Sequence, residues 1–171
     1  MKDKPFLILI DGPMGSGKTT VSQLLHKKLK RTSHIGLDRI KRYISDFKRN
    51  PKDNEISRNI VFAMTDAYLK QGINVIVEQG MRDTHINAFK KIAKKNKIKC
   101  FIYQLDAPKK LLFERVHKRT ALLGKPKTST ARIERNYKIH LANKYKHMNI
   151  FNSEKLNPEQ IAKLILKDLK K

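Results

Sequence analysis

A short apolar run, a glycine-rich turn and an amphipathic helix follow one another near the start of the chain. Phe6–Ile10 is continuously apolar, which is typical of a buried parallel strand. The turn after it, Gly12–Thr19, reads GPMGSGKT and fits the pattern G-x-x-x-x-G-K-[ST]. A buried strand that turns directly into a helix predicts an α/β fold with a parallel sheet. The apolar face of the helix is marked by Val21, Leu24, Leu25 and Leu29.

The rest of the chain repeats the alternation of strand and helix. Ile73–Val77 and Cys100–Leu105 are apolar runs that predict buried strands, while His34–Leu37 and Asn149–Phe151 are weaker candidates for edge strands. Apolar residues at helical spacing fill the intervals. This order predicts a parallel sheet that is covered on both faces through right-handed crossovers. Without an internal repeat, and at a length typical of one domain, residues 1–171 are expected to form a single domain.

The Gly12–Thr19 turn has the chemistry of a phosphate-binding loop. Its glycines let backbone N–H groups turn inward around phosphate oxygens, and the helix N-terminus adds unpaired donors and partial positive charge. Lys18 is predicted to reach the β- and γ-phosphates, and Thr19 to place its hydroxyl on Mg²⁺. The sequence therefore predicts that the chain binds a nucleoside triphosphate. The residues expected to form the cradle are Gly12, Met14, Gly15, Ser16, Gly17, Lys18, Thr19 and Thr20.

Several classes of phosphate-loop protein are excluded by missing motifs. A GTP switch needs an Asn-Lys-x-Asp guanine reader, but Asn96–Lys99 and Asn143–Lys146 both have Lys where the Asp is required. The Leu-Ser-Gly-Gly-Gln signature of transporter ATPases is absent. The chain is also short for a motor module with its own lid domain. A small phosphotransferase remains.

Two carboxylates follow predicted strands at the sheet edge where ligands bind in α/β proteins. Asp38 comes after the strand at 34–37 and is predicted to accept the proton of an acceptor hydroxyl; the alternative role is that of a helix N-cap. Glu78 comes after Ile73–Val77 and is predicted to hold a metal-bound water or the acceptor; the alternative is a strand-end charge in solvent. Asp11, beside the loop, is interpreted as a local turn partner.

Two pairs of arginines flank a segment without apolar periodicity, Thr120–Thr130, which is interpreted as a mobile loop between two helices. Arg115 and Arg119 lie four residues apart, share a helical face, and are predicted to neutralise the phosphoryl group during transfer. Arg132 and Arg135 follow the loop and are predicted to close on the site from its other side. A solvated basic face is the alternative for each of the four arginines.

In their order along the chain these residues resemble the small P-loop kinases related to polynucleotide 5′-hydroxyl kinase, zeta-toxin-like kinases and chloramphenicol phosphotransferase. The resemblance begins with the Gly12–Thr19 loop and continues through most of the chain. Its later members are Asp38 with Lys41, Glu78, the string Asp106-Ala107-Pro108, Arg115 with Arg119, and Lys125-Pro126.

The resemblance implies a three-layer αβα core with a five-stranded parallel sheet, and a small helical lid over about residues 116–135. It implies ATP as the usual phosphoryl donor and Asp38 as the general base. The Mg²⁺ site at Thr19 and Glu78 is the prediction from the residues themselves. Lys41 stands where the polynucleotide kinase branch has Arg, and Glu78 where it usually has Asp. The side chains expected to contact the acceptor are Asp38, Lys41, Glu78, Arg132 and Arg135.

The charge of the chain favours an anionic partner. There are 39 Lys and Arg against 15 Asp and Glu, a formal net charge of +24. Such a surface attracts polyanions through counterion release, which supports a nucleic acid acceptor. A lysine-rich host proteome would give the same composition. Aromatic residues make up only 7% and Trp is absent, so an extended base-stacking platform is not expected.

The single cysteine, Cys100, rules out an intrachain disulfide framework and predicts a reducing compartment. The run Phe6–Ile10 is far shorter than the ~20 residues of a membrane span, so no membrane partner is expected. We therefore expect a cytoplasmic protein.

Two classes of function fit these residues. The first is a Mg²⁺-ATP-dependent kinase that transfers the γ-phosphoryl group to a hydroxyl, with a polynucleotide 5′-hydroxyl and a small molecule both open as acceptors. A nucleoside monophosphate kinase is a variant of this class. The second is a nucleotide-gated nucleic-acid-binding protein without phosphotransfer. The partners expected are a nucleoside triphosphate and a hydroxyl-bearing acceptor.

Overall fold

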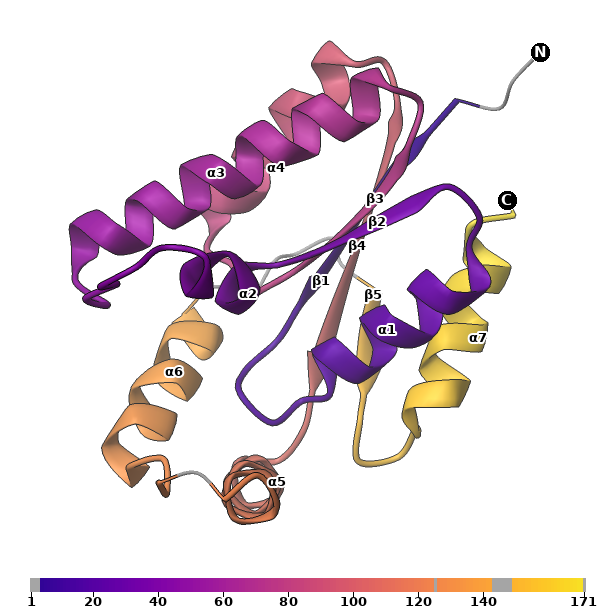
Figure 1. Ribbon diagram of the computed structural model, residues 1–171. Helices are drawn as coiled ribbons and strands as arrows, with labels where there is room; N and C mark the ends of the chain where they lie inside the picture. Colours follow the sequence, from indigo (N-terminus) through magenta and orange to yellow (C-terminus); the bar gives the residue numbers. More distant parts are fainter. Residues whose placement is uncertain (1–3, 125, 143–148, 171) are drawn as a thin grey trace.

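A computed structural model describes residues 4–124, 126–142 and 149–170 of the chain. Five strands and seven helices alternate along these residues (Figure 1). The strands are β1 (Phe6–Asp11), β2 (Thr32–Gly36), β3 (Asn74–Glu78), β4 (Lys99–Asp106) and β5 (Asn149–Asn152). The helices are α1 (Lys18–Lys28), α2 (Leu37–Arg42), α3 (Pro51–Lys70), α4 (Asp83–Lys95), α5 (Lys109–Leu122), α6 (Thr130–Ala142) and α7 (Pro158–Asp168).

The strands form one parallel sheet in the order β2-β3-β1-β4-β5. β1 lies at its centre, and Leu7–Ile10 are fully buried, as a strand covered on both faces requires. β2 and β5, the two weak candidates, form the edges of the sheet. The predicted three-layer αβα fold with a five-stranded parallel sheet is thus confirmed.

Helices cover each face of the sheet and give it two separate cores. On one face Val61 of α3 and Phe89 of α4 pack against alternate residues of β1 and β3. On the other face Leu25 of α1 and Ile165 of α7 pack against the intervening residues of the same two strands. Figure 1 shows α3 and α4 on one side of the strands and α1 and α7 on the other.

Because the strands are parallel, their carboxyl ends lie at one edge of the sheet. Gly36 is paired with Glu78, and Glu78 with Ile10, so the ends of β2, β3 and β1 are neighbours. α5 and α6 lie beyond this edge (Figure 1). Everything that the chain places at the carboxyl ends therefore faces the same region.

The loop was predicted over Thr120–Thr130, and the predicted start of this loop is wrong. α5 continues to Leu122, and the connection to α6 extends only over residues 123–129. Thr120 is buried and its hydroxyl donates to the His117 carbonyl 2.9 Å away, which satisfies a polar side chain inside the helix. Polar composition there reflects this local bond rather than the end of the helix.

Among the described residues, no helix is both long and apolar enough to cross a membrane. Cys100 carries a free thiol. Burial raises the pKa of this thiol to about 11, so it is unreactive at neutral pH.

Candidate functional site

The turn between β1 and α1 is held close to its neighbours by its glycines. Gly12, Gly15 and Gly17 have φ values of 148°, 85° and 92°, which side-chain-bearing residues rarely adopt. A Cβ on Gly12 would lie 2.3 Å from the Leu105 carbonyl oxygen, and one on Gly15 would lie 2.7 Å from that of Leu112. The turn is therefore packed against β4 and α5, and only glycine fits these two positions.

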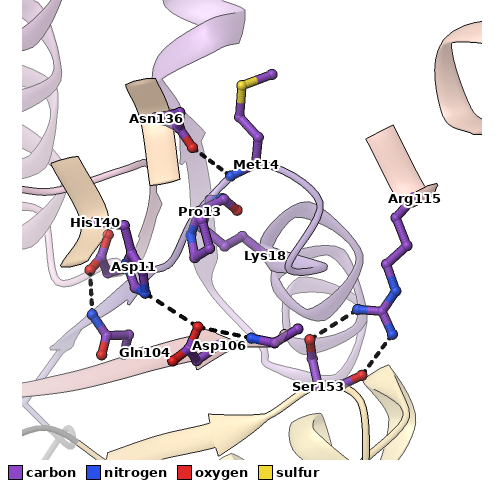
Figure 2. Close-up of polar contacts among 11 residues, drawn as sticks. Asp11, Pro13, Met14, Lys18, Gln104, Asp106, Arg115, Asn136, His140 and Ser153 are labelled. Carbon is purple, nitrogen blue, oxygen red and sulfur yellow. Dashed lines mark hydrogen bonds and ion pairs between the residues drawn. The ribbon is translucent and has the colours of Figure 1, made fainter. Parts of the chain in front are cut away.

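Lys18, the first residue of α1, folds back over this turn. Its ammonium donates a hydrogen bond to the Pro13 carbonyl at 2.8 Å (Figure 2). Burial lowers the pKa of Lys18, while the negative charges of Glu78, Asp11 and Asp38 raise it. A cation that is poorly hydrated and satisfied by a single loop carbonyl is ready to transfer its donors to an incoming anion.

Thr19 meets Glu78 beside this lysine. The Thr19 hydroxyl lies 3.1 and 3.0 Å from the two Glu78 carboxylate oxygens. Burial raises the pKa of Glu78, whereas the charge of Lys18 and the hydrogen bond from Thr19 lower it. The structure thus brings together the two side chains predicted to hold a metal.

The Thr19 hydroxyl and the Glu78 carboxylate are suitable ligands for Mg²⁺. A hydroxyl and a carboxylate are the hard oxygen ligands that Mg²⁺ prefers, and Mg²⁺ is usually held by one or two such groups with water and substrate phosphates. Within the described ranges no cluster of three or more His, Cys, Asp or Glu side chains forms an all-protein metal cage. Thr19 and Glu78 would therefore hold the ion together with the phosphates.

Asp38 lies in the first turn of α2, directly after β2. The alternative assignment as a helix N-cap is wrong: Gly36 is the N-cap residue, and no side chain caps the helix. The Asp38 carboxylate is 77% exposed and lies 3.8 Å from the ammonium of Lys41. Its charge acts on the pKa values of both Lys18 and Glu78. An accessible carboxylate within electrostatic range of the phosphate loop has the position expected of a base.

The two arginines of α5 differ in their contacts. Arg115 donates to the Ser153 hydroxyl at 3.0 Å and to its carbonyl at 2.7 Å (Figure 2). Arg119 is exposed, and its positive charge lowers the pKa of Lys18. Arg119 is therefore near the phosphate loop, whereas Arg115 is tied to the segment after β5. Their proposed contacts with a phosphoryl group remain predictions.

A cavity of about 540 Å³ opens between the phosphate loop and this segment. Its size is within the range of small-molecule sites. Residues 153–158, which line it, were missed by sequence reasoning because no motif marks them. The lining includes Gly15, Gly17, Thr20, Arg115, Arg119 and Asn157.

α6 contacts the phosphate loop through a residue that the sequence did not single out. The Met14 amide donates to the Asn136 side-chain oxygen at 2.7 Å (Figure 2). Arg132, one turn earlier, lowers the pKa of Lys41 and is therefore near α2. Arg135 is exposed on the same helix. The contact residue Asn136 lies in α6, just after the end of the predicted lid at residue 135.

Asp11, the residue before the phosphate loop, connects β1 to neighbouring segments through its carboxylate. Its carboxylate accepts from the Met81 amide at 2.8 Å and from the Gln104 side chain at 3.1 Å. It is 2% exposed, so it has no access to a substrate. The interpretation of Asp11 as a turn partner rather than a catalyst agrees with these contacts, which join β1, β4 and the segment after β3.

Asn136→Ala should lower stability because the Met14 amide loses its partner. Loss of one such hydrogen bond costs about 1 kcal/mol, which lowers the melting temperature by roughly 2–4 °C at this size. Thermal unfolding followed by circular dichroism measures the change. Asn87→Ala, at an exposed position in α4, is the control and should not lower the melting temperature. Equal melting curves for Asn136→Ala and the unmodified chain would show that this contact does not stabilise the fold.

Comparison with known proteins supports the fold. A family model described as "AAA domain" matches residues 7–142. The tunicamycin resistance protein of Deinococcus radiodurans aligns over 98% of this chain and 96% of its own, with 18% identity and a TM-score of 0.69. The APS kinase CysC of Mycobacterium tuberculosis, solved with AMPPNP and APS, aligns over 98% and 99%, with 15% identity and a TM-score of 0.72.

A component of the Pnkp1/Rnl/Hen1 RNA repair complex is also similar. It aligns over 86% of this chain and 47% of its own, with 20% identity and a TM-score of 0.72. At these identities the solved structures share the fold with this chain.

Proposed function

Because the chain belongs to the AAA domain family through residues 7–142, we propose that it is a phosphotransferase that moves the γ-phosphoryl group of Mg-ATP to a hydroxyl acceptor. The observation that carries this proposal is the meeting of Thr19 and Glu78 beside Lys18. It puts a metal-binding pair and a phosphate-binding cation at one edge of the sheet, with Asp38 in electrostatic range. The kinases among its structural neighbours support the same class of reaction.

In the proposed reaction, the backbone of Gly12–Gly17 and the ammonium of Lys18 hold the triphosphate. Thr19 and Glu78 would hold Mg²⁺, which would supply positive charge to the phosphate oxygens. The acceptor oxygen forms a bond to the γ-phosphorus, the bond to the β–γ bridging oxygen breaks, and its electron pair leaves with ADP. Asp38 takes the proton of the acceptor hydroxyl. Arg119 and Arg115, on α5, are proposed to stabilise the transferring group.

Helices α5 and α6 and the phosphate loop also fit a related kind of kinase. We propose that α5, α6 and their connection form the lid of one kinase domain in a cytoplasmic protein. A nucleoside monophosphate kinase would use the same parts. The non-catalytic alternative, a nucleotide-gated nucleic-acid-binding protein, rests on the net charge of +24. Asp38 favours the enzyme, since a binding protein has no need of an accessible carboxylate near Lys18.

A label-transfer assay tests the proposal. The chain is mixed with Mg²⁺ and γ-labelled ATP and offered 5′-hydroxyl oligonucleotides, nucleoside monophosphates and hydroxylated small molecules in parallel. Label on one class of acceptor is the expected result and identifies the acceptor. Salt-sensitive binding of oligonucleotides with no label on any acceptor would contradict the kinase and support the binding protein.

Glu78→Gln should raise the Mg²⁺ concentration needed for nucleotide binding by about tenfold, because it removes one charge-assisted ligand. It should also raise the melting temperature at pH 7. The pKa of Glu78 is raised by burial, so the ionised carboxylate destabilises the folded state above that pKa, and an uncharged side chain removes this penalty. The gain should disappear as the pH falls through the raised pKa. An unchanged Mg²⁺ requirement with Glu78→Gln would remove this residue from the metal site.

A further inference from the structure

Exposed cations gather at the edge of the sheet that lies opposite the phosphate loop. α1, α3 and α4 end at this edge and β2, β3 and β4 begin there, toward the top and right of Figure 1 and away from α5 and α6. The segments that form it, residues 26–32, 69–74 and 93–99, contain no Asp or Glu. The exposed cations of these segments, which we call the amino-edge face, are Lys27, Lys28, Lys30, Arg31, Lys70, Lys94, Lys95, Lys97 and Lys99.

Hydrogen bonds join the strand ends of this face into one surface. Asn74 begins β3, and its amide donates to the Arg31 carbonyl at 2.9 Å. The Asn74 side chain donates to the Lys30 carbonyl at 3.2 Å and accepts from the Phe6 amide at 3.1 Å. Phe6 in turn pairs with Lys99 across β1 and β4. The backbones of Arg31 and Lys99 therefore lie at opposite sides of four adjacent strands, about 14 Å apart at the usual strand spacing.

Few of these charges are neutralised within the protein. Asp66, one turn before the end of α3, lies 2.7 Å from the Lys70 ammonium and 3.7 Å from that of Lys95. Within residues 4–124, 126–142 and 149–170, the other cations of the amino-edge face form no ion pair. A surface with this much unpaired positive charge attracts a polyanion.

The helix dipoles account for only part of the charge. The negative end of a helix stabilises cations in its last turn, and the effect fades beyond that turn. This explains the lysines that end α1, α3 and α4. Four further cations come after the helices, in turns or at the start of β4: Lys30, Arg31, Lys97 and Lys99. Their charge needs another reason.

Two of these four cations occupy backbone positions that favour glycine. Arg31 and Lys97 have φ values of 47° and 54°, in the left-handed region. The turns after α3 and α4 close alike, each with a hydrogen bond from an isoleucine amide to a carbonyl near the end of the helix. In the turn after α3, Gly72 stands at the position that Lys97 occupies after α4. Because glycine suits this position better, the lysine is expected to serve binding rather than folding.

The chemistry of the amino-edge face favours a double-stranded nucleic acid over other polyanions. A membrane-bound face needs apolar side chains that insert among lipids, and a face for single strands needs exposed aromatic rings. Residues 26–32, 69–74 and 93–99 contain no Phe, Tyr or Trp, and none of the exposed large apolar side chains of the described chain lies in them. The phosphates of a duplex are contacted by Lys and Arg without either feature.

We propose that the amino-edge face binds the phosphate backbone of a nucleic-acid duplex without reading its base sequence. This inference goes beyond the proposed function and does not depend on it. The face lies at the far edge of the sheet from Gly12–Thr19, so a duplex and a nucleotide can be bound at the same time.

Fluorescence anisotropy tests the proposal with the full chain and a short labelled DNA duplex whose phosphorylated 5′ ends offer no acceptor hydroxyl. The logarithm of the association constant should fall against the logarithm of salt concentration with a slope of about −3.6 or steeper, as four phosphate contacts give. A saturating non-hydrolysable Mg-ATP analogue should leave the affinity unchanged, because it binds at the other edge. Displacement of the duplex by the analogue would overturn the proposal.

Parallel titrations separate the other anions. A second DNA duplex of unrelated sequence should bind equally, and a single strand should bind more weakly at the same salt concentration. An RNA duplex of the same length identifies which nucleic acid is preferred. A single strand or phosphatidylserine vesicles that bind as tightly as the preferred duplex would overturn the proposal.

A triple variant assigns the binding to the amino-edge face. Replacing Arg31, Lys97 and Lys99 together by Gln should flatten the salt slope by about three and weaken duplex binding at least tenfold near physiological salt. Melting curves identify a variant that fails to fold. Lys97→Gly alone should weaken binding about fivefold and still raise the melting temperature by roughly 2 °C. Full affinity in folded Lys97→Gly and in the folded triple variant would contradict the proposal.

The matched control removes the same charge elsewhere. Lys52, Lys110 and Lys118 are exposed, at the start of α3 and on α5, and are replaced together by Gln. This control should keep the salt slope and most of the affinity. Equal losses in the two triple variants would show that net charge alone attracts the duplex and would overturn the assignment to the amino-edge face. These outcomes do not depend on whether the chain transfers phosphate.

Discussion

Lys18→Met should reduce the kcat/KM of phosphotransfer by at least about 10²–10³, the loss seen when one preorganised donor to a developing charge is removed. The ammonium of Lys18 now rests on the Pro13 carbonyl at 2.8 Å. Methionine keeps the length of the side chain and removes all three donors. The expected loss comes from weaker binding of Mg-ATP and from poorer stabilisation of the transferring group.

Melting curves distinguish a direct loss of activity in Lys18→Met from a loss caused by misfolding. Burial lowers the pKa of Lys18, so at pH 7 its charge destabilises the folded state, and Lys18→Met should melt no lower than the unmodified chain. Lys27→Met, at an exposed position in the last turn of α1, is the matched control and should retain full transfer. Transfer by Lys18→Met within threefold of the control would show that this lysine does not hold the phosphates.

Asp38→Asn should slow transfer by about 10²–10⁴, the usual contribution of a general base, while the Kd of Mg-ATP stays within about twofold. The amide has the shape of the carboxylate but cannot take the acceptor proton. Single-turnover transfer measures the first effect, and calorimetric titration with Mg-ATP measures the second. The split between rate and affinity is what distinguishes a base from a residue that only binds the nucleotide.

Asp46→Asn is the matched control for Asp38. Asp46 is exposed and lies 3.7 Å from Lys48, in the segment between α2 and α3. Its φ of 56° is a conformation that Asn tolerates well. This change should leave both rate and affinity unaltered. Equal turnover by Asp38→Asn and Asp46→Asn would remove Asp38 from the mechanism.

The central parts of the fold could be predicted because their sequence pattern is local. Phe6–Ile10 is apolar at every position, since β1 is buried on both faces, and the turn after it needs glycine wherever φ is positive. β2 was harder to predict, because Thr32–His34 at the sheet edge are only half-buried and polar. Thr120 was misread as loop because its hydroxyl bonds within its own helix.

The parts of the site that sequence reasoning missed depend on contacts between distant residues. Asn136 and Met14 are 122 positions apart, and Arg115 and Ser153 are 38 apart. Nothing in the local pattern of α6 or of the segment after β5 indicates these partners. Motifs identify the phosphate loop, whereas contacts such as that of Asn136 with Met14 are visible only in the tertiary structure.

Calorimetric titration of the intact chain with Mg-ATP tests most directly whether Gly12–Thr19 cradles a triphosphate. We predict saturable heat with one nucleotide per chain, much weaker binding by Lys18→Met, and unchanged binding by Lys27→Met. A parallel titration with Mg-GTP tests whether the site prefers adenine or guanine in the nucleotide. No heat with either nucleotide, or equal binding by Lys18→Met, would contradict the assignment of this turn as a nucleotide site and the kinase with it.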